Sequence, residues 1–397
     1  MENKFKDYAA NEYNSKWKKM IKRERQIYKR ENDMRSEFER DYTRILHSDA
    51  FRRLKHKTQV FFSPENDHIC TRIEHVLHVD SVSYTIAKYL GLNTELTRAI
   101  AMGHDLGHSP FGHEGERILS EISQKDIGEK FWHERNGLEY VDKIELLEDD
   151  NRNEQNLNLT YAVRDGIISH CGEIDENKIR PREEYIDLNE YTKPNEFAPY
   201  TWEACVVKVS DKISYLGRDI EDAITLGVLD NQLEELYEIL QSKKVINNTV
   251  IINHLVKDLC ENSSIENGLC FSNETFKLIK EIKDFNYKYI YKANKISAST
   301  RYFSIMLHEI YYILKGAYNG NKTLEKIHQM KKIHPELFSG FEDWLSDYWQ
   351  YDRKETNCNE ILFNIENEKD YCRAIIYYIS GMTDNFAIET YKRITGF

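Results

Sequence analysis

Proline is rare in this chain and missing from its middle. Only six prolines occur in 397 residues, and none lies between Pro199 and Pro335. Proline breaks a helix and glycine weakens it, so a long stretch with few of either favours long helices. Beyond residue 230 the apolar residues recur at helical spacing, and they predict helices over residues 231–242, 248–261, 273–291, 298–317, 336–350 and 368–393.

The first half of the chain also shows helical patterns, beginning with residues 15–46. Asn93 or Thr94 is placed to cap a later helix. Residues 55–62 are rich in β-branched and aromatic side chains, so a short β-hairpin or an extended segment is expected there. Residues 145–159 are acidic and rich in asparagine, and we expect a loop. The sequence therefore predicts an all-α fold with one short β-hairpin at most.

The composition is typical of a soluble globular protein, with 31% charged and 40% hydrophobic residues. There is no run of about 18 apolar residues, so we expect no membrane span. The first 20 residues are polar and charged, unlike the apolar part of a secretory signal. The seven cysteines are scattered and form no CxxC pair, which indicates reduced thiols and a cytoplasmic location.

Charge is distributed unevenly along the chain. The formal net charge is -12, yet residues 1–60 carry 17 Lys and Arg against 10 Asp and Glu. A basic section in an acidic protein can bind a polyanion locally, which makes single-stranded DNA one partner to test. We interpret residues 16–40 as a solvated charged helix rather than as a nucleic-acid arm.

Residues 104–116 gather three histidines and three carboxylates within thirteen positions, after an apolar helical run. The adjacent His104 and Asp105 offer one nitrogen and one oxygen ligand to a single cation, and His108 lies one helical turn beyond His104. Further on, His113 and Glu116 stand three residues apart, so a carboxylate can orient an imidazole. The alternative is a polar helix end with incidental histidines. Such a group is costly to gather, however, unless a metal or a substrate satisfies it.

Two further helices carry candidate polar residues. Over residues 68–90, Arg72 and His75 stand three positions apart and share a helical face. A second stretch places Asp211, Tyr215 and Asp219 four residues apart on one face, after an apolar run. An ordinary amphipathic helix would explain either stretch taken alone, and they gain weight only beside residues 104–116.

Together these pieces resemble the HD-domain superfamily of metal-dependent phosphohydrolases, and within it the deoxyguanosine triphosphate triphosphohydrolase family. The resemblance covers roughly residues 35–225 and the C-terminus, whereas residues 230–370 match no motif. It divides the chain into a catalytic core with a basic N-terminal section (1–230) and a helical region completing the pocket and an oligomer interface (231–397). The matching elements are Phe51-Arg52-Arg53-Leu54, Lys57-Thr58-Gln59-Val60, Arg72-x-x-His75, the block His104 to Glu116, Thr160 to Glu173, Ser210 to Tyr215, Asp219 with Glu221-Asp222-Ala223, and Gly381-Met382-Thr383-Asp384.

The resemblance implies an all-helical HD fold with a metal held by His75, His104, Asp105 and Asp211. The spacing of these residues supports the same set, with two imidazoles and two carboxylates from three helices. Mixed nitrogen and oxygen ligands without thiolate suit Mn²⁺, Fe²⁺, Co²⁺ or Mg²⁺, and Zn²⁺ is also compatible.

The reaction that the resemblance implies is hydrolysis of a deoxynucleoside triphosphate (dNTP) to deoxynucleoside and inorganic triphosphate. His113, oriented by Glu116, would act as general acid or base. The implied substrate contacts are Arg72, His108, His133 and Lys212 on phosphate oxygens, Gln59, Tyr215 and Asp219 on the deoxyribose, and Arg53 as a further contact.

The resemblance also implies a homo-oligomer, built from dimers and extending to a tetramer or a hexamer, and a nucleotide effector. Two alternatives stay open. Another HD phosphohydrolase, acting on a nucleotide or a cyclic nucleotide, would keep the metal site and change the leaving group. A nucleic-acid-binding regulatory protein with a vestigial site would use the basic N-terminal section instead.

Overall fold

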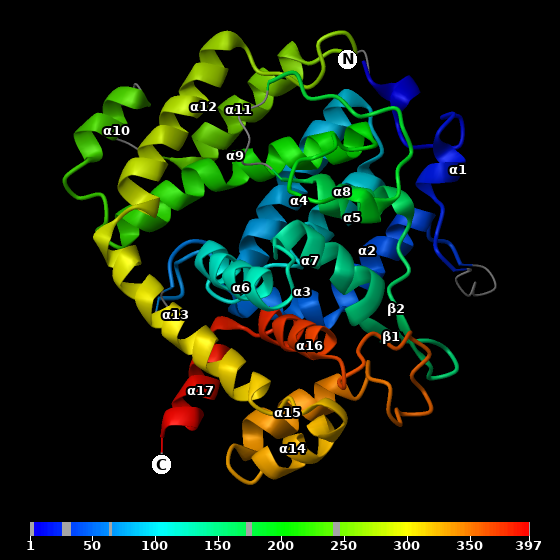
Figure 1. Ribbon diagram of the computed structural model, residues 1–397. Helices are drawn as coiled ribbons and strands as arrows, with labels where there is room; N and C mark the ends of the chain where they lie inside the picture. Colours follow the sequence, from blue (N-terminus) through cyan, green and yellow to red (C-terminus); the bar gives the residue numbers. More distant parts are fainter. Residues whose placement is uncertain (1–3, 26–32, 63–65, 172–176, 241–246, 397) are drawn as a thin grey trace. The chain divides into compact units, whose positions relative to one another are not determined.

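Helices make up most of the regular structure in the described part of the chain. The computed structural model describes residues 4–25, 33–62, 66–171, 177–240 and 247–396, which hold the helices α1 to α17 and one small two-stranded sheet (Figure 1). The predicted all-α fold is confirmed. Among the helices of these residues, not one combines the length and the apolar character needed to cross a membrane.

The chain forms two compact units, and each unit draws on several separate segments. The first unit contains residues 1–46, 65–105 and 158–297, and the second contains residues 47–64, 106–157 and 298–397. The division predicted near residue 230 separates a catalytic core from a helical C-terminal region by their roles. That division stays a prediction.

Four helices form the centre of the first unit: α4 (Arg72–Leu90), α5 (Thr94–Gly103), α8 (Tyr161–Ser169) and α9 (Trp202–Thr225). The helix α4 packs against both α5 and α9, and α8 contacts the same two helices (Figure 1). The apolar side chains of this group are buried, and α9 is buried along most of its length. The remaining helices of the unit are α1 (Trp17–Met20), α2 (Glu37–His47, of which His47 already belongs to the second unit), α10 (Leu233–Ile239), α11 (Asn248–Asn262) and α12 (Asn273–Asn286).

Local capping explains where two of these central helices begin. Thr71 and Glu74 form a capping box at the start of α4, which satisfies N–H groups that have no partner within the helix. The predicted cap at Asn93 is confirmed, because its side-chain oxygen accepts from the N–H groups of Glu95 and Leu96. These caps fix the start of the two helices that carry His75 and His104.

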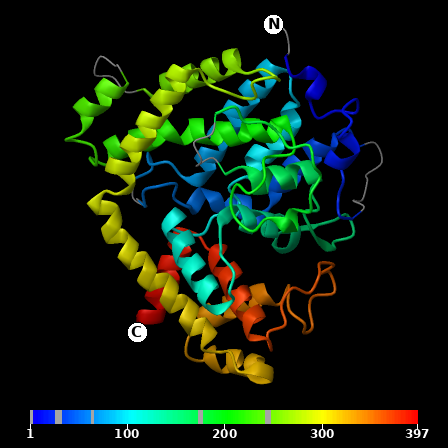
Figure 2. The same ribbon diagram turned by 45° about the horizontal axis from the view of Figure 1, so that its top comes forward.

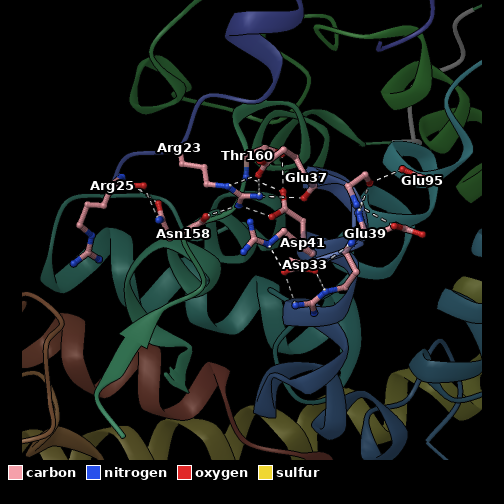
Figure 3. Close-up of polar contacts among 12 residues, drawn as sticks. Arg23, Arg25, Asp33, Glu37, Glu39, Asp41, Glu95, Asn158 and Thr160 are labelled. Atoms are coloured by element: carbon pink, nitrogen blue, oxygen red, sulfur yellow. Dashed lines mark hydrogen bonds and ion pairs between the residues drawn. The ribbon is translucent and has the colours of Figure 1, made fainter. Parts of the chain in front are cut away.

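A buried ion pair ties the N-terminal section to the start of α8 (Figure 3). The guanidinium of Arg23 contacts Asp41 and Glu37, and it donates to the backbone oxygen of Asn158. Asp41 is fully buried, and its other oxygen accepts from the backbone N–H of Thr160 at 2.8 Å and from its hydroxyl at 2.6 Å. Asp41 therefore joins the N-terminal section to the residue that precedes α8.

The second unit is built mainly from helices late in the chain. The helix α16 (Glu368–Ser380) packs against α6 (Gly112–Asp126), although some 250 residues separate them in sequence (Figure 2). The sheet pairs β1 (Leu146–Glu148) with β2 (Glu154–Asn156) antiparallel. The other helices of the unit are α3 (Asp49–Arg53), α7 (His133–Glu139), α13 (Asn294–Lys315, which enters the unit at Ala298), α14 (Thr323–Met330), α15 (Pro335–Leu345) and α17 (Asp384–Thr395).

Three local expectations are wrong. The helix predicted over 15–46 is interrupted: its described parts contain only α1, α2 and turns, while residues 26–32 lie outside the described residues. Of the two alternatives given for residues 55–62, the hairpin is not found, because these residues form the end of a 3₁₀ turn followed by bends and irregular backbone. The hairpin lies instead within residues 145–159, where a loop was predicted. The helix predicted over 368–393 is two helices, because the chain turns at residues 381–383 and Thr383 caps α17.

Removing the carboxylate of Asp41 should destabilise the fold. In the Asp41→Ala variant, Arg23 loses one of its two carboxylate partners in a buried setting, and the N–H of Thr160 loses its acceptor. We expect the free energy of unfolding to fall by about 3 kcal/mol, as measured by denaturant titration. Glu39→Gln is the matched control, because Glu39 lies exposed on the same helix, and it should change stability by less than about 0.5 kcal/mol. Equal effects of the two changes would contradict the importance of the ion pair.

Candidate metal centre and histidine cluster

Three helices of the first unit bring the predicted metal ligands together, and we call His75, His104, Asp105 and Asp211 the metal cluster. His75 lies in the first turns of α4, His104 ends α5, and Asp211 lies within α9. The Nε2 atom of His75 is 2.9 Å from Oδ1 of Asp211. The Nε2 atom of His104 is 3.5 Å from Oδ1 of Asp105 and 4.0 Å from Oδ1 of Asp211. The ligand atoms of His75, His104 and Asp211 lie within 4.8 Å of one another and can share one cation, with Asp105 beside His104.

The ring of His104 is oriented as a metal ligand requires. Its Nδ1 atom bonds to the backbone oxygen of Ala101 at 2.7 Å. A carbonyl oxygen only accepts, so the proton is on Nδ1 and the lone pair is on Nε2. That Nε2 atom is buried and has no hydrogen-bond partner among the described residues. A buried acceptor without a partner is costly, and a cation at this place would satisfy it.

The charges within the cluster favour an ionised Asp211. Burial raises the pKa of Asp211, but the hydrogen bond and the charge of His75 lower it by more than burial raises it. The pKa of Asp211 therefore lies below its usual value. For His75, burial lowers the pKa and the bond to Asp211 raises it by more. A metal ion and a proton cannot both occupy Nε2 of His75, so metal binding there competes with protonation of the ring.

Arg72 lies beside the metal cluster, and two of its three side-chain nitrogen atoms have no hydrogen-bond partner among the described residues. Its Nη1 atom donates to Oδ2 of Asp105 at 2.9 Å, and its side chain is 1% exposed. The Nε and Nη2 atoms are buried without a partner among the described residues. A guanidinium in this state can bind an anion such as a phosphate oxygen.

The other predicted residues of α9 lie on the face expected for them. Tyr215 is half-buried and Asp219 is buried, and both follow Asp211 at intervals of one turn within a continuous helix. Lys212 is also buried. An Oδ2 atom of Asp219 accepts from the hydroxyl of Tyr291 at 2.6 Å. Burial and the charge of Asp219 raise the pKa of Tyr291 well above its usual value, so this hydroxyl stays protonated.

Two residues of this unit lie at the candidate site although the sequence did not single them out. Tyr291 lies at the end of the π-helical turn after α12, in a stretch rich in tyrosine that gave no signal for one position. His170 ends α8, and its ring centroid lies 5.1 Å from that of His104. The Nδ1 atom of His170 bonds to the backbone oxygen of Ile167, as His104 does to Ala101. One histidine after an apolar helical run looks like an ordinary core residue in sequence.

The second unit holds a group that we call the histidine cluster: His108, His113, Glu116 and His133. The rings of His108 and His133 are stacked with centroids 3.8 Å apart, and His113 lies edge-on to both. Glu116 bonds to Nδ1 of His133 at 3.0 Å and to the N–H of His133 at 3.1 Å, and it lies 3.7 Å from Nδ1 of His113. His108, Glu116 and His133 also approach one another closely enough to hold a cation.

The histidine cluster depends on a tight turn before α6. At Gly107, a Cβ atom would lie 2.0 Å from the backbone oxygen of His133 and 2.1 Å from the nitrogen of Gly137, so only glycine lets α7 approach this closely. Phe111, which precedes α6, has a φ of 63°, a conformation that few residues other than glycine adopt. The chain is therefore held in a strained turn between His108 and His113.

Arg53 and Gln59 also belong to the second unit. Arg53 pairs with Glu145 at 2.8 Å, and its Nε atom is buried without a partner among the described residues. The side-chain oxygen of Gln59 is buried and has no partner there either. This oxygen can accept a hydrogen bond from a ligand hydroxyl.

Losing one imidazole should empty the metal cluster. In His104→Ala, the two carboxylates and His75 remain, but the buried nitrogen that has no hydrogen-bond partner among the described residues is gone. We expect stoichiometric binding of Mn²⁺ to disappear, as measured by calorimetric titration of chelator-treated protein. His328→Ala is the control, because His328 is half exposed and pairs with Glu342, outside the metal cluster. Full metal occupancy of His104→Ala would refute the site.

Comparison with known proteins agrees with this geometry. Residues 72–216 match the HD domain, a range that contains all four residues of the metal cluster. The deoxyguanosinetriphosphate triphosphohydrolase-like protein of Caldanaerobacter subterraneus subsp. tengcongensis is 33% identical over 366 residues, covering 91% of this chain and 86% of that protein. The protein of the same name from Rickettsia bellii is 33% identical over 379 residues, with 91% and 92% covered. The chain therefore belongs to the deoxyguanosinetriphosphate triphosphohydrolase-like family of HD-domain proteins.

Proposed function

We propose that this protein hydrolyses dNTPs to deoxynucleoside and inorganic triphosphate with the help of a divalent metal ion. Membership of the HD family supports a hydrolase, and the names of the relatives supply the substrate class. The observation that carries the proposal is the pairing of the metal cluster with Arg72. A cation site beside a buried guanidinium with two unpaired donors suits a phosphate group.

The metal cluster offers imidazole and carboxylate ligands and no thiolate, which suits Mn²⁺, Fe²⁺, Co²⁺ or Mg²⁺, with Zn²⁺ also compatible. A divalent ion bound there would polarise a phosphate oxygen and lower the pKa of a bound water toward neutrality. The buried lone pair on Nε2 of His104 supports this assignment.

The remaining charged residues would bind the triphosphate and move its protons. Arg72 and Lys212 would bind phosphate oxygens, together with His108 and His133. The family resemblance supports the assignment of the metal cluster and the histidine cluster to one reaction. His113 is the exposed imidazole of its cluster, and we assign it the proton for the departing 5′-oxygen.

A second set of residues would select the sugar. Asp219 would accept from the 3′-hydroxyl, and its bond to Tyr291 holds the carboxylate in place. Gln59 offers a buried carbonyl oxygen for another sugar or base contact. Tyr215 under the sugar would leave little room for a 2′-hydroxyl, which gives a steric reason to prefer deoxyribose.

The supporting proposals concern assembly and location. We propose a homo-oligomer because exposed apolar side chains gather on α13 and α17, including Tyr302, Ile305, Tyr312 and Phe386. A nucleotide effector and single-stranded DNA are further partners that the family resemblance and the basic N-terminal section suggest. A cytoplasmic location agrees with seven cysteines of which none forms a disulfide in the structure.

Product analysis tests the reaction. We expect purified protein with Mn²⁺ to release inorganic triphosphate and deoxynucleoside from at least one of the four dNTPs, as resolved by anion-exchange chromatography. Release of orthophosphate or pyrophosphate would instead identify another HD phosphohydrolase. Nucleic-acid binding that survives Asp105→Ala, without any hydrolysis, would favour a regulatory protein with a vestigial site.

His113 should matter to turnover and not to metal binding. We expect His113→Ala to keep its affinity for Mn²⁺ and to lose about 10²- to 10⁴-fold in kcat, the usual contribution of a general acid or base. Glu116→Gln should cost less, because an amide keeps part of the hydrogen bonding to His133 and His113. Steady-state kinetics and metal titration measure both effects. Normal turnover of His113→Ala would make His133 the next candidate, and loss of metal would make His113 a ligand.

A further inference from the structure

The turn between α16 and α17, which we call the C-terminal turn (residues 380–384), holds a carboxylate that serves two distant parts of the chain. Asp384 is 2% exposed. Its Oδ1 atom accepts from the backbone N–H of Phe111 at 2.8 Å, and its Oδ2 atom accepts from the backbone N–H of Thr58 at 2.8 Å. The two donors lie 273 and 326 residues away in sequence, and both belong to the second unit.

Further bonds join the C-terminal turn to the same region. The buried ammonium of Lys57 donates to the backbone oxygens of His108 and Ser380. The amide of Asn136 donates to the backbone oxygen of Gly107 at 2.7 Å and to the hydroxyl of Ser380 at 3.3 Å. The loop that carries His108 and leads to His113 is thus bonded at Gly107, His108 and Phe111. The partner side chains are Asn136 and Lys57, which also bond to Ser380, and Asp384 of the C-terminal turn itself.

The two bonds of the Asp384 carboxylate are not needed to cap α17, the helix that begins at Asp384. Thr383 caps α17, since its hydroxyl oxygen accepts from the N–H of Phe386 at 3.2 Å. The carboxylate of Asp384 instead bonds across to Phe111, the residue with a φ of 63° that ends the strained turn, and to Thr58, the neighbour of Gln59. The two N–H groups bond to different oxygens of Asp384, so an amide in its place would turn an NH₂ group toward one of them.

We propose that Asp384 is a positioning residue that holds the loop of His108 and His113 and the segment of Gln59 in the geometry required for hydrolysis. The inference rests on the proposed function, and it gives a role to a stretch of sequence that the reaction itself leaves unused. Asp384 acts through Phe111 and Thr58, so it touches neither substrate nor metal. None of the bonds described for it involves the metal cluster, so metal affinity should not depend on it.

Asp384→Asn tests the proposal most directly. The variant keeps the size of the side chain but turns one acceptor into an NH₂ group that faces a backbone N–H. Loss of one charge-assisted hydrogen bond corresponds to about 10- to 100-fold in rate if its effect falls on turnover. We expect kcat for triphosphate release to fall by that factor, the dissociation constant of Mn²⁺ to change less than about twofold, and Asp384→Glu to recover part of the rate because it restores both oxygens.

The matched control is Asp258→Asn in the first unit. Asp258 also accepts two bonds, from the N–H of Ser272 at 2.8 Å and from its hydroxyl at 2.7 Å, and it lies in no candidate site. Thermal unfolding of both variants measures the structural cost. A merely structural Asp384 would lower stability as Asp258→Asn does and leave kcat unchanged per folded molecule, and that result would overturn the proposal. Should Asp384→Asn fail to fold, Lys57→Met frees the loop of His108 from the same turn and should lower kcat in the same way.

Amide exchange keeps this test separate from the proposed function. If wild-type protein releases no triphosphate from any dNTP, the proposed substrate is wrong. The positioning role is then measured by manganese-dependent hydrolysis of bis(4-nitrophenyl) phosphate and by hydrogen exchange at Thr58 and Phe111. Faster exchange at these two amides, together with slower hydrolysis in Asp384→Asn, supports the proposal. Unchanged hydrolysis in that variant, whatever the exchange rates, overturns it.

Discussion

The hydrogen bond between Nδ1 of His104 and the backbone oxygen of Ala101 decides what the centre of the first unit can do. It places the proton on Nδ1 and leaves a lone pair on a buried Nε2 atom next to two carboxylates. The bond requires α5 to end at this histidine, so that an otherwise unpaired carbonyl near the helix end is available. Next to this histidine, Gly103 lets α8 pack closely against the end of α5, since a Cβ there would lie 2.9 Å from a methyl group of Ile167. Helix termination, packing and ligand orientation are therefore coupled.

What the sequence could predict follows from how local each signal is. The cap at Asn93 and the one-turn spacing of Asp211, Tyr215 and Asp219 depend on neighbours within one helix, so they could be predicted from pattern alone. The break of the last helical run at residues 381–383 was missed although Gly381 lies in it, since one glycine does not end every helix. The hairpin at 146–156 was missed because its strands have three residues each, too few to show alternation.

The residues missed in the candidate site share a different cause. Tyr291 belongs to the candidate site because it bonds to Asp219, and His170 because its ring contacts that of His104. In both pairs the two residues are distant in sequence. Spacing along a chain has no information about such pairs. The same holds for Glu116: a separation of three residues suggested His113, whereas the shorter bonds run to His133, seventeen positions away. The sequence could name the residue types of the histidine cluster but not the partner of its carboxylate.

The choice of His133 as the main partner of Glu116 has chemical consequences. Burial raises the pKa of Glu116, but the charges and hydrogen bonds of His133 and His113 lower it to well below its usual value, so the carboxylate is ionised at neutral pH. One anion then serves a buried imidazole and an exposed one. His133, bonded twice and stacked on His108, is fixed in orientation, while His113 keeps the freedom to exchange protons with solvent. This difference is a physical reason to assign phosphate binding to the first and proton transfer to the second.

Buried carboxylates that accept from loops explain how helices from remote parts of the chain are aligned. Backbone groups inside a helix satisfy one another, so the unsatisfied N–H groups lie at helix starts and in turns. Glu203, fully buried in the first turn of α9, accepts from the N–H groups of Ala10 and of Asn93, the residue that caps α5. Asp41 does the same for Thr160 before α8, and Asp384 for Phe111 before α6. Each of these acids therefore fixes the start of one helix that positions a histidine. The helix is α5 with His104 for Glu203, α8 with His170 for Asp41, and α6 with His113 for Asp384. An ionised carboxylate offers acceptors only, whereas an amide of similar size would also present an NH₂ group beside these N–H groups, so a carboxylate suits such positions.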